Sequence, residues 1–398
     1  MEIYKLKTEE LSDFEFKNGI NKMRVPELFF GDYITTLKDV LNKRFPFMRV
    51  LVAYTESLYE KFAKGIATAF EKTNSAYTEY VVTEGDNGAF NFGSEYRCVV
   101  AVGEKAYYSL VPFACERNVP VITVITEGDL FGLVPSETLV EENGIYSFKT
   151  FNAQKTLILD KTLYKSFDNK TVASVISHGL SYLSGLFDLT TKVRRQPLKE
   201  CTDLLKYAVN GFLNLDFSDE AFYGKYVEYS LKLGMAEYFS GKNHVTRLSP
   251  FWCGVAFGKK PFSLYGYFAM KKLCDLYYIY FTEDLTDYPV VCDYEKNVSE
   301  IAKRKGINAS YLMKINRPDA KEYYSFETEL TKNKKFFAEK LVKMKPLVLK
   351  GERVISSVYP YTDVTDEEIS EAIRTAPYIT DEKILLKYIR DSGLLENV

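Results

Sequence analysis

Histidine is almost absent from this chain: among 398 residues, only His178 and His244 carry an imidazole ring. A metal site that needs three histidine ligands from one chain is therefore excluded. A site built from one carboxylate and two histidines is still permitted by this count.

Cysteine pairs at metal-binding or redox spacing are also missing. Six cysteines are scattered along the sequence, and none of them forms a Cys-X-X-Cys pair. Such scatter matches neither a zinc ribbon nor a disulfide framework. We expect reduced thiols that are mostly buried.

Neither a secretory signal nor a membrane-spanning run is evident. The beginning of the chain, MEIYKLKTEELSDFEF, is charged throughout, whereas a signal peptide has an apolar central region. No apolar stretch approaches the roughly 18 residues of a membrane span. We expect a cytoplasmic protein without a membrane partner.

An excess of charge of one sign is lacking as well, because 52 Lys and Arg stand against 54 Asp and Glu. No overall positive field is available to attract phosphate backbones or anionic membranes. Nucleic acid is not expected as a partner, although a local basic patch is left open. The lysine-rich stretch KNKKFFAEKLVKMK is most simply a solvated helix face.

What the chain does have is enough apolar sequence for sizeable cores. Its composition is 46% apolar and 27% charged, which is typical of a folded globular protein. At roughly 150 residues per domain, this length suggests two or three domains. We expect two.

Short strand-like runs alternate with helical stretches through the first third of the chain. The runs are 47–53, 77–83, 97–102 and 119–126, and a helix is expected over 104–117. Such alternation is typical of a parallel sheet with helices packed on its faces. Residues 1–160 are therefore predicted to form a Rossmann-like α/β domain.

Two local details belong to the same interpretation. Ser57 and Glu60 form a capping-box pattern, which predicts the start of a helix. Two further strand candidates, 144–151 and 155–159, are separated by so few residues that we expect them to pair as a hairpin.

Helical periodicity dominates after residue 160. One predicted helix, for example, places Tyr226, Tyr229 and Leu233 close to one face. Residues 161–398 are therefore predicted to form an all-α domain.

Four segments carry a resemblance to a known family, namely residues 25–41, 99–126, 155–167 and 371–389. In the same order, they are similar to segments of the iron-containing alcohol dehydrogenase and dehydroquinate synthase superfamily. The stretch 99–126, VVAVGEKAYYSLVPFACERNVPVITVIT, is similar to that family's strand, glycine turn (GGGxxxDxxK) and helix. Residues 25–41 and 155–167 are similar to its entry strand and to its passage into the helical domain. Residues 371–389 resemble the closing helices of its glycerol-1-phosphate dehydrogenase branch.

The resemblance implies a dehydroquinate synthase-like fold and an oxidoreductase that uses NAD(P) together with Zn²⁺ or Fe²⁺. In the family, the pyrophosphate lies over the glycine turn at a helix N-terminus, where backbone N–H groups receive it. The metal acidifies the substrate alcohol while hydride moves to the nicotinamide.

This chain departs from the family in the glycine turn. Gly103 is retained, but Glu104 and Lys105 replace the next two glycines, and Ser109 and Pro112 stand where the family has Asp and Lys. A side chain in such a turn hinders close approach of a phosphate to the backbone. The dinucleotide site is therefore interpreted as degenerate, with Gly103 and Ser109 at cofactor-binding positions.

Two further cofactor-binding positions follow the fourth strand-like run. Thr126 and Asp129 match the family's "PT" threonine and the Asp a few residues later. They are placed to bind a ligand at the carboxyl edge of the sheet. Both are also ordinary turn-forming residues, and that alternative stays open.

The metal ligands implied by the resemblance are poorly kept. The family's carboxylate falls on Tyr182, the first histidine is kept as His244, and the second falls on Lys259. A phenol with a pKa of about 10 is a poor ligand for a divalent ion. His244 is thus interpreted as the remnant of a metal site, and we expect no metal.

Two other arrangements are left open. His178 lies one helical turn before Tyr182 and could join His244 and Asp188 in a shifted site. Lys259 could supply a fixed positive charge instead of the ion. His178 and Lys259 are accordingly the candidate catalytic residues.

Two hypotheses about function result. In the first, the chain has lost metal and NAD(P) binding and serves as a non-catalytic binding or scaffold protein, with no cofactor. In the second, it is an NAD(P)-dependent oxidoreductase that acts on a small polyol phosphate or sugar phosphate in a remodelled site. The resemblance also implies a homo-oligomer, most simply a dimer.

Overall fold

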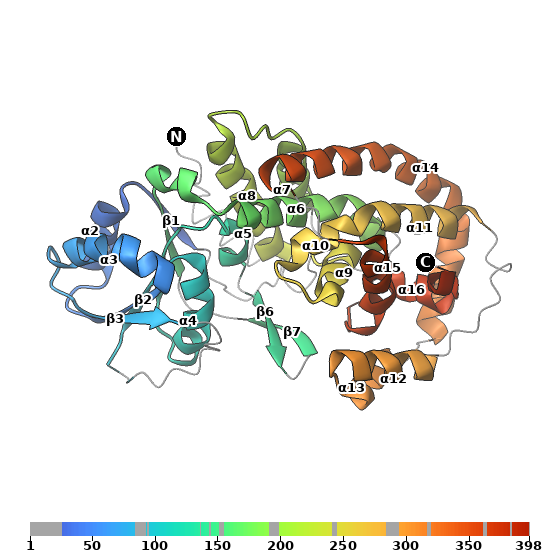
Figure 1. Cartoon of the computed structure of the whole chain (residues 1–398), viewed down its shortest axis with the longest axis horizontal. Helices are drawn as coiled ribbons and strands as arrows, with labels where there is room; N and C mark the ends of the chain where they lie inside the picture. The colour runs from blue at the N-terminus through green and yellow to red at the C-terminus, as the bar shows by residue number, and fades with distance from the viewer. Residues whose placement is uncertain are drawn as a thin grey trace. The chain divides into compact units, whose positions relative to one another are not determined.

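The computed structural model (Figure 1) describes residues 26–83, 93, 95–135, 137–142, 145–150, 155–190, 199–240, 245–283, 294–316, 320–360, 364–382 and 384–397. The chain divides into two compact units of contacting residues. The first unit is Met1–Thr138 with Lys149–Val172, and the second is Leu139–Phe148 with Ala173–Val398. This grouping does not test the domain boundary expected at residue 160, which stays a prediction.

A parallel sheet forms the centre of the first unit, as predicted, and it has six strands. Its spatial order is β1-β8-β5-β4-β2-β3, and every neighbouring pair runs parallel. The strands are β1 (Glu27–Phe30), β2 (Arg49–Thr55), β3 (Ala76–Val82), β4 (Cys98–Val102), β5 (Val121–Val124) and β8 (Lys155–Leu159).

Helices cover this sheet because its central strands are apolar on both faces. Alternate residues of β2, such as Val50 and Val52, join a core with α2 (Tyr33–Arg44) and α3 (Glu56–Phe70). The intervening residues of each strand point to the opposite face. The helix α4 (Glu104–Glu116) contacts β2, β4 and β5. A parallel sheet buried in this way reads in sequence as near-continuous apolar runs.

The hairpin expected between 144–151 and 155–159 is wrong. The strand β7 (Ile145–Thr150) pairs instead with β6 (Glu137–Glu142) in a separate two-stranded sheet. All five residues of β8 are buried, and β8 lies between β1 and β5. Proximity in sequence predicted the wrong partner because a buried strand gains more from two parallel neighbours than from one hairpin.

The capping box expected at Ser57 and Glu60 is also wrong. The helix α3 begins at Glu56, its N-cap is Thr55, and no side chain caps it. The Thr55 hydroxyl instead lies 3.3 Å from the Ser57 hydroxyl. The strand β2 runs directly into the helix, which leaves no room for a cap at Ser57.

The helical character predicted after residue 160 is confirmed. The second unit is helical apart from the part of the β6–β7 sheet that it includes. Its main helices are α6 (Asn169–Thr190), α7 (Lys199–Leu213), α8 (Phe222–Ser240), α9 (Ser249–Phe257), α10 (Phe262–Phe268), α11 (Met270–Thr282), α12 (Tyr294–Lys305), α13 (Ala309–Asn316), α14 (Ala320–Val358), α15 (Asp366–Thr375) and α16 (Leu385–Asp391). None of the helices in the described part of the chain is long and apolar enough to cross a membrane.

Candidate functional site

The candidate site lies at the carboxyl ends of β4 and β5, in the first unit. Gly103 follows β4 and donates its N–H to the carbonyl of Val124, the last residue of β5, at 3.0 Å. This bond brings the turn before α4 next to the loop 126–129. Ligands of open α/β sheets bind outside the carboxyl ends of the strands.

Gly103 is required by the backbone of this turn. Its φ is 93°, and an added Cβ would lie 2.3 Å from Leu58 Cδ1 and 3.0 Å from Thr126 Oγ1. The positive φ disfavours any other residue there, and a side chain would also displace those of Leu58 and Thr126. The glycine kept at this position therefore preserves the shape of the turn.

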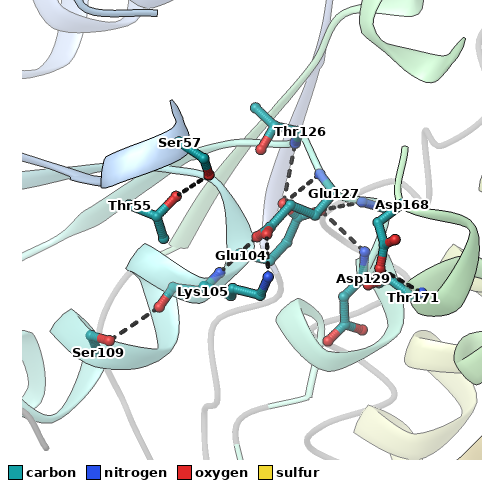
Figure 2. Close-up of polar contacts among 11 residues, drawn as sticks. Thr55, Ser57, Glu104, Lys105, Ser109, Thr126, Glu127, Asp129, Asp168 and Thr171 are labelled. Atoms are coloured by element: carbon teal, nitrogen blue, oxygen red, sulfur yellow. Dashed lines mark hydrogen bonds and ion pairs between the residues drawn. The ribbon is translucent and has the colours of Figure 1, made fainter. Parts of the chain in front are cut away.

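The Glu104 carboxylate fills the loop 126–129. Its Oε2 accepts hydrogen bonds from the backbone N–H groups of Thr126 at 3.1 Å and Glu127 at 2.9 Å. Its Oε1 accepts from Gly128 at 2.6 Å and Asp129 at 3.1 Å. Figure 2 shows the carboxylate facing this row of four amides. Four consecutive N–H groups that converge on one point form an anion-binding nest.

Burial sets the electrostatics of this carboxylate. Glu104 is only 1% exposed, and desolvation, together with the nearby Glu127 carboxylate, raises its pKa to about 7. The backbone hydrogen bonds act in the opposite direction because they favour the charged form. Near neutral pH, the nest therefore holds an acid that exchanges a proton.

The Glu127 carboxylate lies at the N-terminus of α4. It accepts a hydrogen bond from the backbone N–H of Lys105 at 3.0 Å and lies 3.1 Å from Lys105 Nζ. One Glu127 oxygen is 3.4 Å from the point where a Cβ of Gly103 would stand. The two acids therefore make reciprocal contacts. The Glu104 carboxylate binds the backbone around Glu127, and the Glu127 carboxylate binds the backbone N–H of Lys105, next to Glu104. We call them the exchanged pair of carboxylates.

The predicted cofactor-binding residues around this pair have structural contacts. Asp129 accepts from the Gly132 N–H at 3.0 Å and from the Tyr108 hydroxyl at 2.7 Å, so it caps the short helix α5 (Leu130–Leu133). Ser109 donates to the Lys105 carbonyl within α4 at 3.2 Å. Thr126 is 3% exposed, and among the described residues its hydroxyl has no hydrogen-bond partner.

A pyrophosphate does not fit this turn as it stands. In the family that the sequence resembles, a phosphate accepts hydrogen bonds from the backbone N–H groups at the start of this helix. Here the Glu127 carboxylate already accepts from Lys105, and the second carboxylate, Glu104, lies in the adjoining loop. A phosphate could enter only if Glu127 moved away.

Three predicted site residues lie in the helical unit. His178, on α6, lies with Nδ1 2.6 Å from the Ser263 hydroxyl, and burial lowers its pKa to about 4. Tyr182 is 4% exposed, and burial raises its pKa to about 12. Lys259 Nζ lies 2.7 Å from a carboxylate oxygen of Glu368, and both side chains are partly exposed.

Asp188, the alternative third ligand, is engaged by the protein. Its carboxylate accepts from the Ser249 N–H at 2.8 Å, from the Ser249 hydroxyl at 2.9 Å and from the Leu385 N–H at 2.5 Å. It connects the starts of α9 and α16 to α6. His244, the expected metal remnant, lies outside the described residues.

The described residues contain no cluster of three or more His, Cys, Asp and Glu side chains that could hold a metal ion. Tyr182 is protonated at neutral pH because of its raised pKa, and Lys259 presents a cation that pairs with an acid. Neither is a ligand for Zn²⁺ or Fe²⁺ in that state. Because His244 is outside this part of the chain, the expected absence of metal stays a prediction.

Comparison with known proteins gives a match in structure alone. No protein-family model matches the sequence, and no curated protein does. Maleylacetate reductase from Rhizobium sp. strain MTP-10005 is similar over 95% of this chain and 97% of its own, at 12% identity and a TM-score of 0.56. The archaeal Red Sea brine pool alcohol dehydrogenase ADH/D1 matches over 94% and 98%, at 12% identity and a TM-score of 0.54.

A third similar structure is that of an iron-containing alcohol dehydrogenase. The iron-containing alcohol dehydrogenase from Thermococcus thioreducens matches over 94% of this chain and 98% of its own, at 11% identity and a TM-score of 0.51. The chain has the fold of the iron-containing alcohol dehydrogenases. The resemblance found in the sequence is thereby confirmed as a likeness of fold. A closer relation to glycerol-1-phosphate dehydrogenase stays a prediction.

Sequence reasoning missed Glu127 altogether. Glu104 was identified only as a replacement for a glycine of the family's turn, and its contacts with the loop 126–129 were not expected, because these bonds span 22 to 25 residues of sequence. The available signal was a pair of acids, one after each of two neighbouring strands. The carboxyl ends of parallel neighbours meet at one edge of the sheet, so this pattern could have suggested the exchange.

Proposed function

We propose that this chain is a strongly diverged protein on the iron-containing alcohol dehydrogenase fold that does not bind NAD(P) in the family's manner. In this proposal it serves as a non-catalytic binding or scaffold protein without a metal. The observation that carries the proposal is the exchanged pair of carboxylates, Glu104 and Glu127, at the turn before α4.

The proposal is supported by the electrostatics of that turn. A pyrophosphate placed at the start of α4 would meet the Glu127 carboxylate, and like charges 4 Å apart repel by about 4 kcal/mol near a protein surface. Glu104 is fixed more firmly, since withdrawing it would leave four backbone N–H groups without an acceptor. Each such buried group costs about 1–3 kcal/mol.

The residues at the expected metal positions support the same proposal. The protonated phenol of Tyr182 and the Lys259 cation offer no anionic ligand. A dehydrogenase of this kind needs a Lewis acid for the alcohol, and the family's ligand set would be reduced to His244.

The alternative is an NAD(P)-dependent oxidoreductase that acts on a small polyol phosphate or sugar phosphate in a remodelled site. It is favoured by one observation: Gly103 keeps its positive φ next to the buried Thr126 hydroxyl, which has no hydrogen-bond partner within the described residues. A displaced Glu127 would open both to a ligand. For either function we propose a cytoplasmic homo-oligomer, and we expect no nucleic acid partner.

Metal content, together with dehydrogenase activity, separates the two functions. The purified protein is analysed for Zn²⁺ and Fe²⁺ and assayed with NAD(P) and glycerol-1-phosphate, alongside the His244→Ala variant. We expect substoichiometric metal and no turnover. Stoichiometric metal, or turnover that His244→Ala abolishes, would overturn the proposal and establish the oxidoreductase.

A further inference from the structure

Exposed apolar side chains gather on one helix of the second unit. Of the nine large apolar residues exposed in the described part of the chain, four lie on α14: Phe336, Val342, Leu347 and Leu349. Val342 is 60% exposed and Phe336 is 58% exposed. Scattered single residues of this kind are ordinary, whereas neighbouring ones on a single face mark an interaction surface.

Helical spacing places part of this group on the outward side of α14. Val342, Pro346 and Leu349 follow one another at intervals of four and three residues, which aligns them along one face. Leu341, Met344 and Val348 are buried on the other side, where α14 contacts α7 and α11. Figure 1 shows α14 running beside α11 along one side of the helical unit.

The same stretch is strongly basic. Between 332 and 353 the sequence has eight Lys and Arg and only two acids, a local net charge of +6 in a chain whose formal net charge is −2. Lys335, Lys343 and Arg353 are exposed, and within the part of the chain that the structure describes they have no ion-pair partner. We call the exposed side of α14 between Lys332 and Arg353 the basic face.

We propose that the basic face of α14 is a peripheral attachment surface for an anionic lipid bilayer. Exposed lysines and an arginine attract acidic headgroups, while Val342 and Leu349 can insert between the lipid headgroups. Clusters of four to eight basic residues on an amphipathic helix are typical of binding to acidic lipids. From Lys335 to Arg353 the helix is about 27 Å long, at 1.5 Å per residue.

Two features favour a bilayer over other anionic partners. Proteins bind nucleic acid backbones through charge and hydrogen bonds. The apolar row of Val342, Pro346 and Leu349 would make no favourable contact with such a backbone. An acidic protein would need a groove matched to a ridge of protruding side chains, whereas lipid headgroups adapt to it. The inference goes beyond the proposed function, because it holds whether or not the chain binds NAD(P). It also replaces the expectation of no membrane partner, which was based on the net charge of the whole chain, because the positive charge is concentrated on one stretch of α14.

The test is cosedimentation of the full chain with vesicles of phosphatidylcholine alone and of phosphatidylcholine with phosphatidylglycerol at 3:1. We expect binding to the second kind only, weakened by high salt. The variant Lys335→Glu/Lys343→Glu/Arg353→Glu should lower the partition coefficient at least tenfold, since each basic residue near such a surface contributes about fivefold. Val342→Ser/Leu349→Ser should lower it several-fold and leave the salt dependence in place.

Matched variants on the first unit are the controls. Lys61→Glu/Lys64→Glu changes exposed lysines of α3. Phe47→Asn removes an apolar side chain that is 78% exposed, at a positive φ that Asn tolerates. Neither control should change vesicle binding.

Three results would overturn the inference. The first is no binding of the wild-type chain to acidic vesicles. The second is an equal loss in the α3 control per charge reversed. The third is salt-sensitive binding to polyglutamate or duplex DNA as tight as to the vesicles and unchanged by Val342→Ser/Leu349→Ser, which would indicate a cation surface for another polyanion. Circular dichroism verifies that each variant is folded.

Discussion

Glu104 Oε1 accepts a hydrogen bond from the backbone N–H of Gly128 at 2.6 Å, across 24 residues of sequence. This contact belongs to a set of four that places the carboxylate in the loop 126–129. A side chain of the protein thereby binds backbone donors at the carboxyl edge of the sheet, the edge where ligands of such sheets bind.

Glu104→Ala should destabilise the protein by at least about 4 kcal/mol, because four backbone N–H groups lose their acceptor and each costs at least about 1 kcal/mol. The measurement is the free energy of unfolding in urea. Glu116→Ala, at the exposed end of the same helix, should change it by less than about 0.5 kcal/mol. Equal midpoints for the two variants would contradict the structural role of Glu104.

The stabilising effect of Glu104 should depend on pH. Its pKa is raised to about 7 in the folded chain, above the ordinary value of about 4.3. Between these two values the folded state binds more protons than the unfolded state, so stability falls as pH rises. The wild type should therefore lose up to about 3 kcal/mol relative to Glu104→Gln from pH 4.5 to pH 7.5.

The check is urea unfolding of both proteins at several pH values across that range. Comparing differences between them cancels the other titrating groups, which the two proteins share. A wild-type advantage that grows with rising pH would show that Glu104 has a lowered pKa instead.

Asp188→Asn should cost about 3 kcal/mol of stability, since an amide nitrogen would face the N–H groups of Ser249 and Leu385. Thermal unfolding measures it, with Asp203→Asn on the exposed side of α7 as the control. Addition of a chelator should leave the melting temperature of the wild type unchanged. A fall on chelation would instead point to a metal bound by this chain.

Substitutions of the buried ion pair Arg247 and Glu237 should have non-additive effects on the free energy of unfolding. The Arg247 Nε lies 3.1 Å from a Glu237 oxygen, and both side chains are at most 6% exposed. Arg247→Met should cost about 3–5 kcal/mol, because it leaves a buried charge uncompensated. The double variant Glu237→Gln/Arg247→Met should be more stable than Arg247→Met alone in urea unfolding, and a less stable double variant would contradict this.

Much of the fold could be predicted from the sequence because its central strands are buried on both faces. Apolar runs such as 97–102 and 119–126 became β4 and β5, and the change to helical periodicity after residue 160 was real. The partner of β8 was not predictable in the same way. Its place between β1 and β5 depends on pairings with residues distant in sequence.

Less of the site could be predicted. Motif positions identified Gly103 and Thr126, which do lie together. The assignment of Tyr182 to the family's carboxylate position stays a prediction. The motif positions gave no information about Glu127, because its contact with Lys105 depends on the geometry of two loops. Comparison with a motif shows which of the family's residues are missing, but it does not predict which side chains fill the space in the folded chain.

The most direct test of the proposed function is calorimetric titration of NADH and NADPH into the purified wild-type chain and into Glu127→Gly. We expect no saturable binding to the wild type up to roughly 1 mM dinucleotide, which corresponds to less than about 4 kcal/mol of binding free energy. We expect measurable binding only where Glu127 has been removed from the start of α4. Micromolar binding of either dinucleotide to the wild type would contradict the proposed function.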